Sequence, residues 1–329
     1  MSNGSHRAAL GLLLLAALGA TACEDGAHHA CEVIVREHVP RVRSIVDDDL
    51  ERTMTGITAA ADLTAPGFLV ADPAQREREM RWAIQHRIRE PPRGIPELMI
   101  SPISFVAAVD AEGHVICRDL DPDQDHMRGL DLGAMFPQVH RALTEGVSSY
   151  ELSEFAALAP PPPAEGEGEH DAGPPEQSSV TVLFAAPARV EGRVVGAIVA
   201  GIPLWSEARR ITRQVQAEGL TTSGAIFWVY FFRGDRLFHH GTPSTLDEIV
   251  PDQATREAGF ANSAGGFCGE QNQFGRWYCY GVVHLPQLGD DVGAIIYRSD
   301  PVDSTRRGGL TVEARASGRF DPRLVAFFG

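Results

Sequence analysis

The sequence predicts an α+β protein in which a long N-terminal helix precedes two similar units, each an antiparallel five-stranded sheet with flanking helices. A strand–turn–strand pattern occurs twice, around residues 105–118 and 225–239. Each copy is followed by the same four residues, Val-Gly-Ala-Ile, at 195–198 and at 292–295. The first copy has the longer spacing, by about the length of a Pro/Gly/Glu-rich stretch at 156–177. Such a repeat indicates two copies of one structural unit.

Residues 31–94 are predicted to form the N-terminal helices. From Val42 onward, apolar residues recur at steps of three and four, which is typical of one buried helix face. Asp72 and Pro73 predict the start of a further helix, because Asp caps free amide groups and Pro suits the first helical position. This helix should end before Pro91.

The first unit is assigned to residues 95–204. A short helix is expected at 137–145. The stretch 156–177 is expected to be disordered, because it has too few apolar residues to bury. It is interpreted as a hairpin-loop insertion, since a domain boundary there would separate strands of one sheet. The predicted strands are 103–109, 114–118, 148–155, 179–188 and 193–202.

The second unit is assigned to residues 223–301. A connecting helix at 205–222 precedes it, with Trp205, Ile211 and Val215 on one side. Residues 302–329 are polar and weakly patterned, so a loosely held tail is expected.

Residues 1–22 have the pattern of a signal peptide. The apolar core at 10–18 is too short to span a membrane. The small residues before Cys23 resemble the lipobox of bacterial lipoproteins, which implies cleavage before Cys23 and a diacylglycerol on its thiol. Residues 23–30 would then be a tether. The alternative is an ordinary secretory peptide cut after Ala22. The expected location is outside the cytoplasm, lipid-anchored to the periplasmic or outer-membrane face of a bacterial envelope membrane.

Composition excludes several classes of function. The hydrophobic share is 43%, as in globular proteins, and the formal net charge is −15, so nucleic acid is not an expected partner. All 29 basic residues are Arg. Without Lys, the chain cannot use a Schiff-base lysine, a Walker lysine or a Ser–Lys pair.

Four cysteines remain after Cys23. An oxidising compartment makes disulfides the expected state. Cys268 and Cys279 flank a turn-like segment between two strand-like runs, so a Cys268–Cys279 bond across a hairpin is predicted. Elimination leaves Cys31–Cys117. A Cys-ligated metal is the alternative, but the chain has no C-x-x-C pair, so no metal site is predicted.

The order of these elements resembles a double Cache domain, the extracytoplasmic PAS-like sensor module of bacterial chemoreceptors and sensor kinases. The likeness is carried by FVAAVDAEGHVICRD (105–119), GLDLG (129–133) and VLFAAPARVEGRVVGAIVAGIPL (182–204). It implies two tandem PAS-like units, a small-molecule pocket in the first, membrane-distal unit and a dimer through the N-terminal helix. This chain is expected to lack the second membrane span and the output domain of the family, so a signal would pass to a separate protein. The amino-acid-binding motif of many members finds no match.

Arg118 and Tyr150 are the candidate ligand-binding residues in the pocket that the resemblance implies. Arg118 ends the second strand and could hold a carboxylate with two parallel bonds. Tyr150 lies on the third strand. The alternative is that Arg118 pairs with Asp119 or Asp121 on the surface and that Tyr150 belongs to the core.

The acidic loop 119–125 alternates Asp residues like the start of a calcium loop. The Gly and acidic residue that an EF-hand needs at its sixth and twelfth positions are missing, so a solvated loop is the preferred interpretation, with calcium as the alternative. Motifs for hydrolases, metalloproteases and phosphate loops are absent from the sequence. The leading hypothesis is a sensor or binding protein, without a cofactor, that is not an enzyme. An interaction lipoprotein without a ligand is second, and an envelope hydrolase third.

Overall fold

The computed structural model describes residues 31, 33–155, 180–220, 226–239, 250–262, 266–273 and 276–299. The predictions for the signal peptide, the Cys23 lipid anchor, the tether, the insertion and the C-terminal tail lie outside the described residues.

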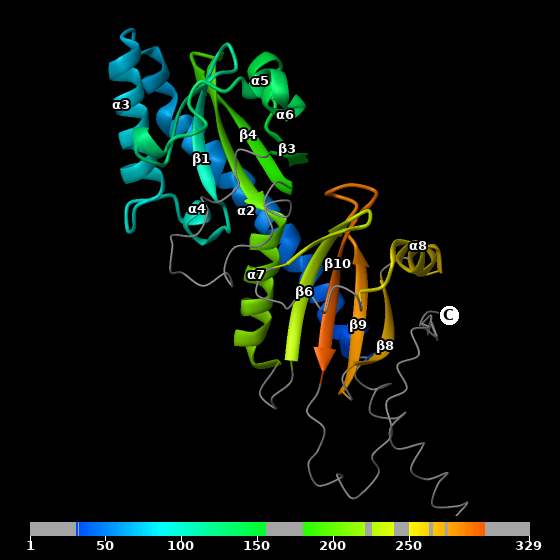
Figure 1. Ribbon diagram of the computed structural model, residues 1–329. Coiled ribbons are helices and arrows are strands. Elements are labelled where there is room, and N and C mark those ends of the chain that lie inside the picture. The colour runs from blue at the N-terminus through cyan, green and yellow to red at the C-terminus, as the bar shows by residue number, and fades with distance from the viewer. Residues whose placement is uncertain are drawn as a thin grey trace, which may run out of the picture.

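A long helix runs behind both sheets and joins them (Figure 1). It begins as a π-helical turn, η1 (Ile34–His38), and continues as α2 (Val39–Thr64) and η2 (Ala65–Leu69). Pro40 has no amide hydrogen to donate, and the hydrogen-bond pattern changes from π to α just before it. The apolar stripe of α2 is buried along its length.

Three further helical segments cover the first sheet beside α2. In α3 (Pro73–Ala83), the carboxylate of Asp72 accepts a hydrogen bond from the amide of Gln75 at 3.0 Å. The chain continues through η3 (Ile84–Ile88) into α4 (Pro96–Ile100).

The first sheet has the strand order β2-β1-β5-β4-β3, and all its neighbours are antiparallel. Between β2 and β3 lie η4 (Pro122–Gln124), α5 (Leu132–Met135) and α6 (Pro137–Thr144). The strands are β1 (Phe105–Asp110), β2 (Val115–Arg118), β3 (Ser149–Glu154), β4 (Val180–Val190) and β5 (Arg193–Pro203).

The second sheet repeats this order as β7-β6-β10-β9-β8. Helix α7 (Leu204–Val215) and η7 (Gln216–Leu220) lead into it from β5, and α8 (Gln253–Asn262) covers it. The repeated Val-Gly-Ala-Ile lies on the central strand of each sheet. The strands are β6 (Ile226–Arg233), β7 (Arg236–Phe238), β8 (Phe267–Gln273), β9 (Arg276–His284) and β10 (Val292–Ser299). The predicted fold class, a long helix followed by two tandem five-stranded PAS-like units, is confirmed.

The helix-facing sides of both sheets share one hydrophobic core with α2 and α7. The outer face of each sheet has a separate core, covered by α5 and α6 in the first unit and by α8 in the second. The two units are therefore held together mainly through the helices.

Both predicted disulfides are wrong. The structure joins Cys31 to Cys268, with Cα atoms 5.8 Å apart, and leaves Cys117 and Cys279 as buried thiols. The prediction assumed a four-residue turn between β8 and β9. Pairing instead continues to Gln273 and Arg276, so Cys268 faces Gly281, and Cys279 is only its diagonal neighbour. The start of the N-terminal helix brings Cys31 to Cys268.

Candidate functional site

Arg118 lies on the outer face of the first sheet, beside its cross-strand partner Ala107. Its Nε is 3.3 Å from an oxygen of Asp119, and its guanidinium lies 5.6 Å from the ring centre of Phe105. The alternative interpretation was a pairing with Asp119 or Asp121 on the surface; the partner is Asp119, but the two side chains are only 13% and 11% exposed, and the contact engages the Nε of the guanidinium.

Tyr150 lies on the opposite, helix-facing side of the same sheet. Its ring packs 5.3 Å from that of Phe184, and burial raises the pKa of its hydroxyl, with a further contribution from Asp47. Arg118 and Tyr150 therefore do not share a pocket. The strand order explains why, because β2 and β3 form the two opposite edges of the sheet.

The resemblance implies a pocket between the sheet and the helices of the first unit. On the outer face of this sheet, the space is filled by apolar side chains. Phe136 and Phe155 meet edge to face at 5.2 Å, and Phe105 lies 6.3 Å from Phe155. Gln138 is a buried polar residue in this layer, and its amide donates to Ser153 at 2.9 Å. The chemistry of this face is that of a packed core.

A groove of about 330 Å³ lies instead where α2 meets both units; we call it the junction groove. Asp47 and Glu51 stand one turn apart on α2, Tyr150 comes from the first unit, and Gln287 comes from the second. The amide of Gln287 donates to Asp47 at 2.7 Å. Leu50, Met54 and Thr55 complete the lining. Sequence analysis identified Tyr150 but missed the others, since nothing local to Gln287 places it beside α2.

A second groove, of about 460 Å³, lies between the end of α2 and α3; we call it the distal groove. Trp82 lines it and is 56% exposed, which is unusual for so large an apolar side chain. Arg78 and Arg87 flank it together with Glu79.

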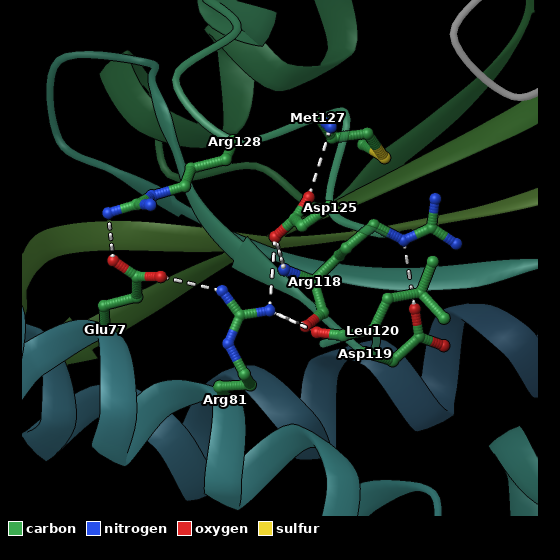
Figure 2. A network of polar contacts seen from close by, with 8 residues as sticks. All are labelled: Glu77, Arg81, Arg118, Asp119, Leu120, Asp125, Met127 and Arg128. Carbon is green, nitrogen blue, oxygen red and sulfur yellow. Dashed lines mark hydrogen bonds and ion pairs between the residues drawn. The ribbon is translucent and has the colours of Figure 1, made fainter. Parts of the chain in front are cut away.

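The acidic loop after β2 is closed onto α3 by Asp125 (Figure 2). One oxygen of Asp125 accepts from the amide of Arg118 at 3.0 Å and lies 3.4 Å from the Arg81 guanidinium, and the other accepts from Met127 at 3.2 Å. Arg81 also donates to the carbonyl of Leu120 and to Glu77. Asp125 thus holds the loop in place.

Three smaller findings concern chemistry and the membrane. Burial raises the pKa of the Cys117 thiol to about 12, which keeps it protonated and unreactive at neutral pH. Among the described residues, no group of three or more His, Cys, Asp and Glu side chains is placed to hold a metal ion. None of the described helices is long and apolar enough to cross a membrane.

No protein-family model and no curated protein matches the sequence. Similar solved structures include the sensor domain of the Vibrio cholerae histidine kinase DctB, at 13% identity and a TM-score of 0.46, covering 83% of this chain and 99% of that one. The sensory domain of the Campylobacter jejuni chemoreceptor Tlp3 with isoleucine bound is 10% identical, with a TM-score of 0.47, and the match covers 84% of this chain and 95% of that one. The ligand-binding domain of the Pseudomonas aeruginosa chemoreceptor PctB with L-Arg is 16% identical, with a TM-score of 0.39, and the match covers 88% of this chain and 99% of that one. The repeated strand order and the long N-terminal helix of this chain form the tandem arrangement predicted from the resemblance to double Cache domains.

Proposed function

We propose that this chain is an exported, lipid-anchored sensor or binding protein of double Cache architecture that recognises a small molecule in the junction groove. The lipobox-like residues before Cys23 support the anchor. The groove supports the binding role, because Tyr150 of the first unit and Gln287 of the second unit line it together. This contact with both units is the observation that carries the proposal.

The lining of the groove favours an organic cation. Asp47 and Glu51 provide two exposed carboxylates, and Tyr150 provides an aromatic ring beside them. Carboxylates pair with amines and guanidinium groups, and an aromatic face attracts a cation at short range. Leu50 and Met54 offer an apolar surface to the carbon skeleton of the ligand.

A ligand in this groove would alter the free energy of the arrangement of the two units, since it would contact both of them. Only a difference in affinity between two arrangements shifts their populations. The signal would then pass to a separate envelope protein.

The test is a thermal-shift measurement on residues 31–300 with arginine, putrescine and choline as probes. A probe that raises the melting temperature of the wild type should fail to do so with Asp47→Asn/Glu51→Gln. Asp62→Asn, an exposed carboxylate on α2 outside the groove, is the matched control and should keep the response. No shift with any cation, or an equal shift in the double variant, would remove the groove as the ligand site.

Lipid attachment is tested separately in the full chain. Cys23→Ser should move the protein from the membrane fraction to the soluble fraction and abolish labelling by a palmitate analogue. A variant that stays in the membrane fraction would point to an anchor other than Cys23.

A second candidate function is protein docking at the distal groove, with the two PAS-like units as scaffold. The exposure of Trp82 favours it, because Trp and Arg dominate the binding energy of many interfaces. Here Trp82→Ala should abolish co-purification of a partner and leave the thermal shift from cations unchanged.

A further inference from the structure

We infer that a proton shared by two buried carboxyl groups locks α7 against α2, and that this lock loosens as the pH rises. The groups are Asp49 on α2 and Glu207 on α7, which are 1% and 5% exposed. Helix α7 is the segment that connects the first sheet to the second, so the lock lies on the link between the two units (Figure 1).

An ionised Glu207 would have no hydrogen-bond donor of its own among the described residues. Asp49 already has two cationic partners: it accepts from Arg52 at 2.7 Å and forms an ion pair with Arg210. Both carboxyl oxygens of Glu207 are buried, and no described residue donates a hydrogen bond to either of them. A buried charge without a partner is strongly unfavourable. As a carboxylic acid, Glu207 can donate its proton to Asp49.

The charged groups around the pair favour one retained proton. Burial raises the pKa of Glu207 well above its ordinary value, and the negative charge of Asp49 raises it further, against the opposing effects of Arg210 and Arg52. Burial also raises the pKa of Asp49, as does Asp48, whereas Arg210, the hydrogen bond with Glu207, and Arg52 lower it. The two groups titrate as a pair, and the folded state holds its proton more tightly than the unfolded state does.

The sign of the pH effect follows from this difference. Stability from the lock is complete below the ordinary carboxyl pKa of 4.5 and is lost as the pH rises toward the raised pKa of the folded state. At higher pH, a second negative charge beside Asp49 favours separation of α7 from α2. The link between the two units would therefore tighten in acid and loosen in alkali.

The experiment compares melting temperatures of the full mature chain between pH 5 and pH 8.5. Between pH 5 and pH 8.5, the melting temperature of the wild type should fall by about 3 °C or more relative to that of Glu207→Gln. The reason is that the side-chain amide in the variant can donate to Asp49 but does not titrate. Glu145→Gln, an exposed control, should keep the wild-type pH profile. Parallel profiles for the wild type and Glu207→Gln would overturn the proposal.

Two further measurements keep the test decisive if Glu207→Gln does not fold. Asp49→Asn should flatten the profile, because Arg210 and Arg52 then gain Glu207 as an ionised partner. In the wild type, amide hydrogen exchange in α7, corrected for intrinsic rates, should accelerate at pH 8.5 relative to α3. Equal protection of the two helices at both pH values would show that α7 is not released.

Discussion

The two units have the same strand order, yet they bury different chemistry. The outer face of the first sheet is lined by Phe, Val, Leu and Ala, and that of the second is rich in tyrosine. Burial raises the pKa of Tyr280, one of these tyrosines, to about 12. One topology thus accommodates two differently built cores.

Beside each sheet, the described residues include a buried arginine that ties a covering helix to the loops of that sheet. Arg81 on α3 is held by two carboxylates, those of Glu77 and Asp125. Arg256 on α8 instead donates to the carbonyls of Pro251 and Gly234 and lies 4.5 Å from the ring centre of Phe232. Burial lowers the pKa of Arg256, against nearby negative charge. The first unit therefore depends on a buried ion network, and the second on carbonyl and aromatic contacts.

The largest expected effect comes from Arg81→Met compared with Arg256→Met. Loss of Arg81 leaves Asp125 as a buried charge without its cation, which should lower the free energy of unfolding by about 3–5 kcal/mol. Loss of Arg256 leaves carbonyl groups without a donor, at a cost of about 1–3 kcal/mol. Urea-induced unfolding of the two variants measures the difference. Equal losses would show that the two arginines stabilise their units in the same way.

The double variant Cys31→Ser/Cys268→Ser should lower stability by about 2–4 kcal/mol, because the bond closes a very long loop in the unfolded chain. Hydrogen exchange should show the loss first in the second unit, which carries Cys268. Cys117→Ser in the first unit is the comparison, since it removes a buried thiol and no crosslink. Equal effects of the two changes would contradict a stabilising role for the disulfide.

A substitution in the two-residue turn between β4 and β5 is expected to have a smaller effect, and to stabilise the protein. Glu191 has a φ of 51°, a conformation that favours Asn or Gly, and Gly192 follows at 80°. Glu191→Asn should therefore raise the free energy of unfolding by up to about 1 kcal/mol. The second unit joins β9 to β10 by a longer connection. A destabilised variant would show that the Glu191 side chain contributes more than its backbone conformation costs.

Sequence could predict the repeat, because strand–turn–strand patterns and the Val-Gly-Ala-Ile motif are local. The disulfide prediction was wrong because the hairpin turn is two residues shorter than the predicted one, which moves Cys279 away from the position opposite Cys268. Asp125 was interpreted as part of a solvated loop, and only the folded chain brings Arg81 to it across 44 residues.

The candidate ligand residues show the same limit. Alternation along a strand predicts which of its own residues share a face, but it does not predict which faces of two distant strands lie on the same side of the sheet. Arg118 and Tyr150 were therefore placed in one pocket although they lie on opposite faces. Tyr150 was a useful choice because it lines the junction groove, where Asp47 and Gln287 join it only after folding.

The smallest effect should come from Arg118→Gln, compared with Tyr150→Ala. Arg118 pairs with Asp119, which keeps a second ion pair with Arg89 at 3.6 Å, so the loss of Arg118 should cost only about 1 kcal/mol. The thermal shift from an organic cation should not change. Tyr150→Ala should reduce that shift, because it removes the aromatic wall of the junction groove. If Arg118→Gln abolishes the response and Tyr150→Ala preserves it, the ligand binds on the outer face of the first sheet, and the phenylalanines packed there must move to admit it.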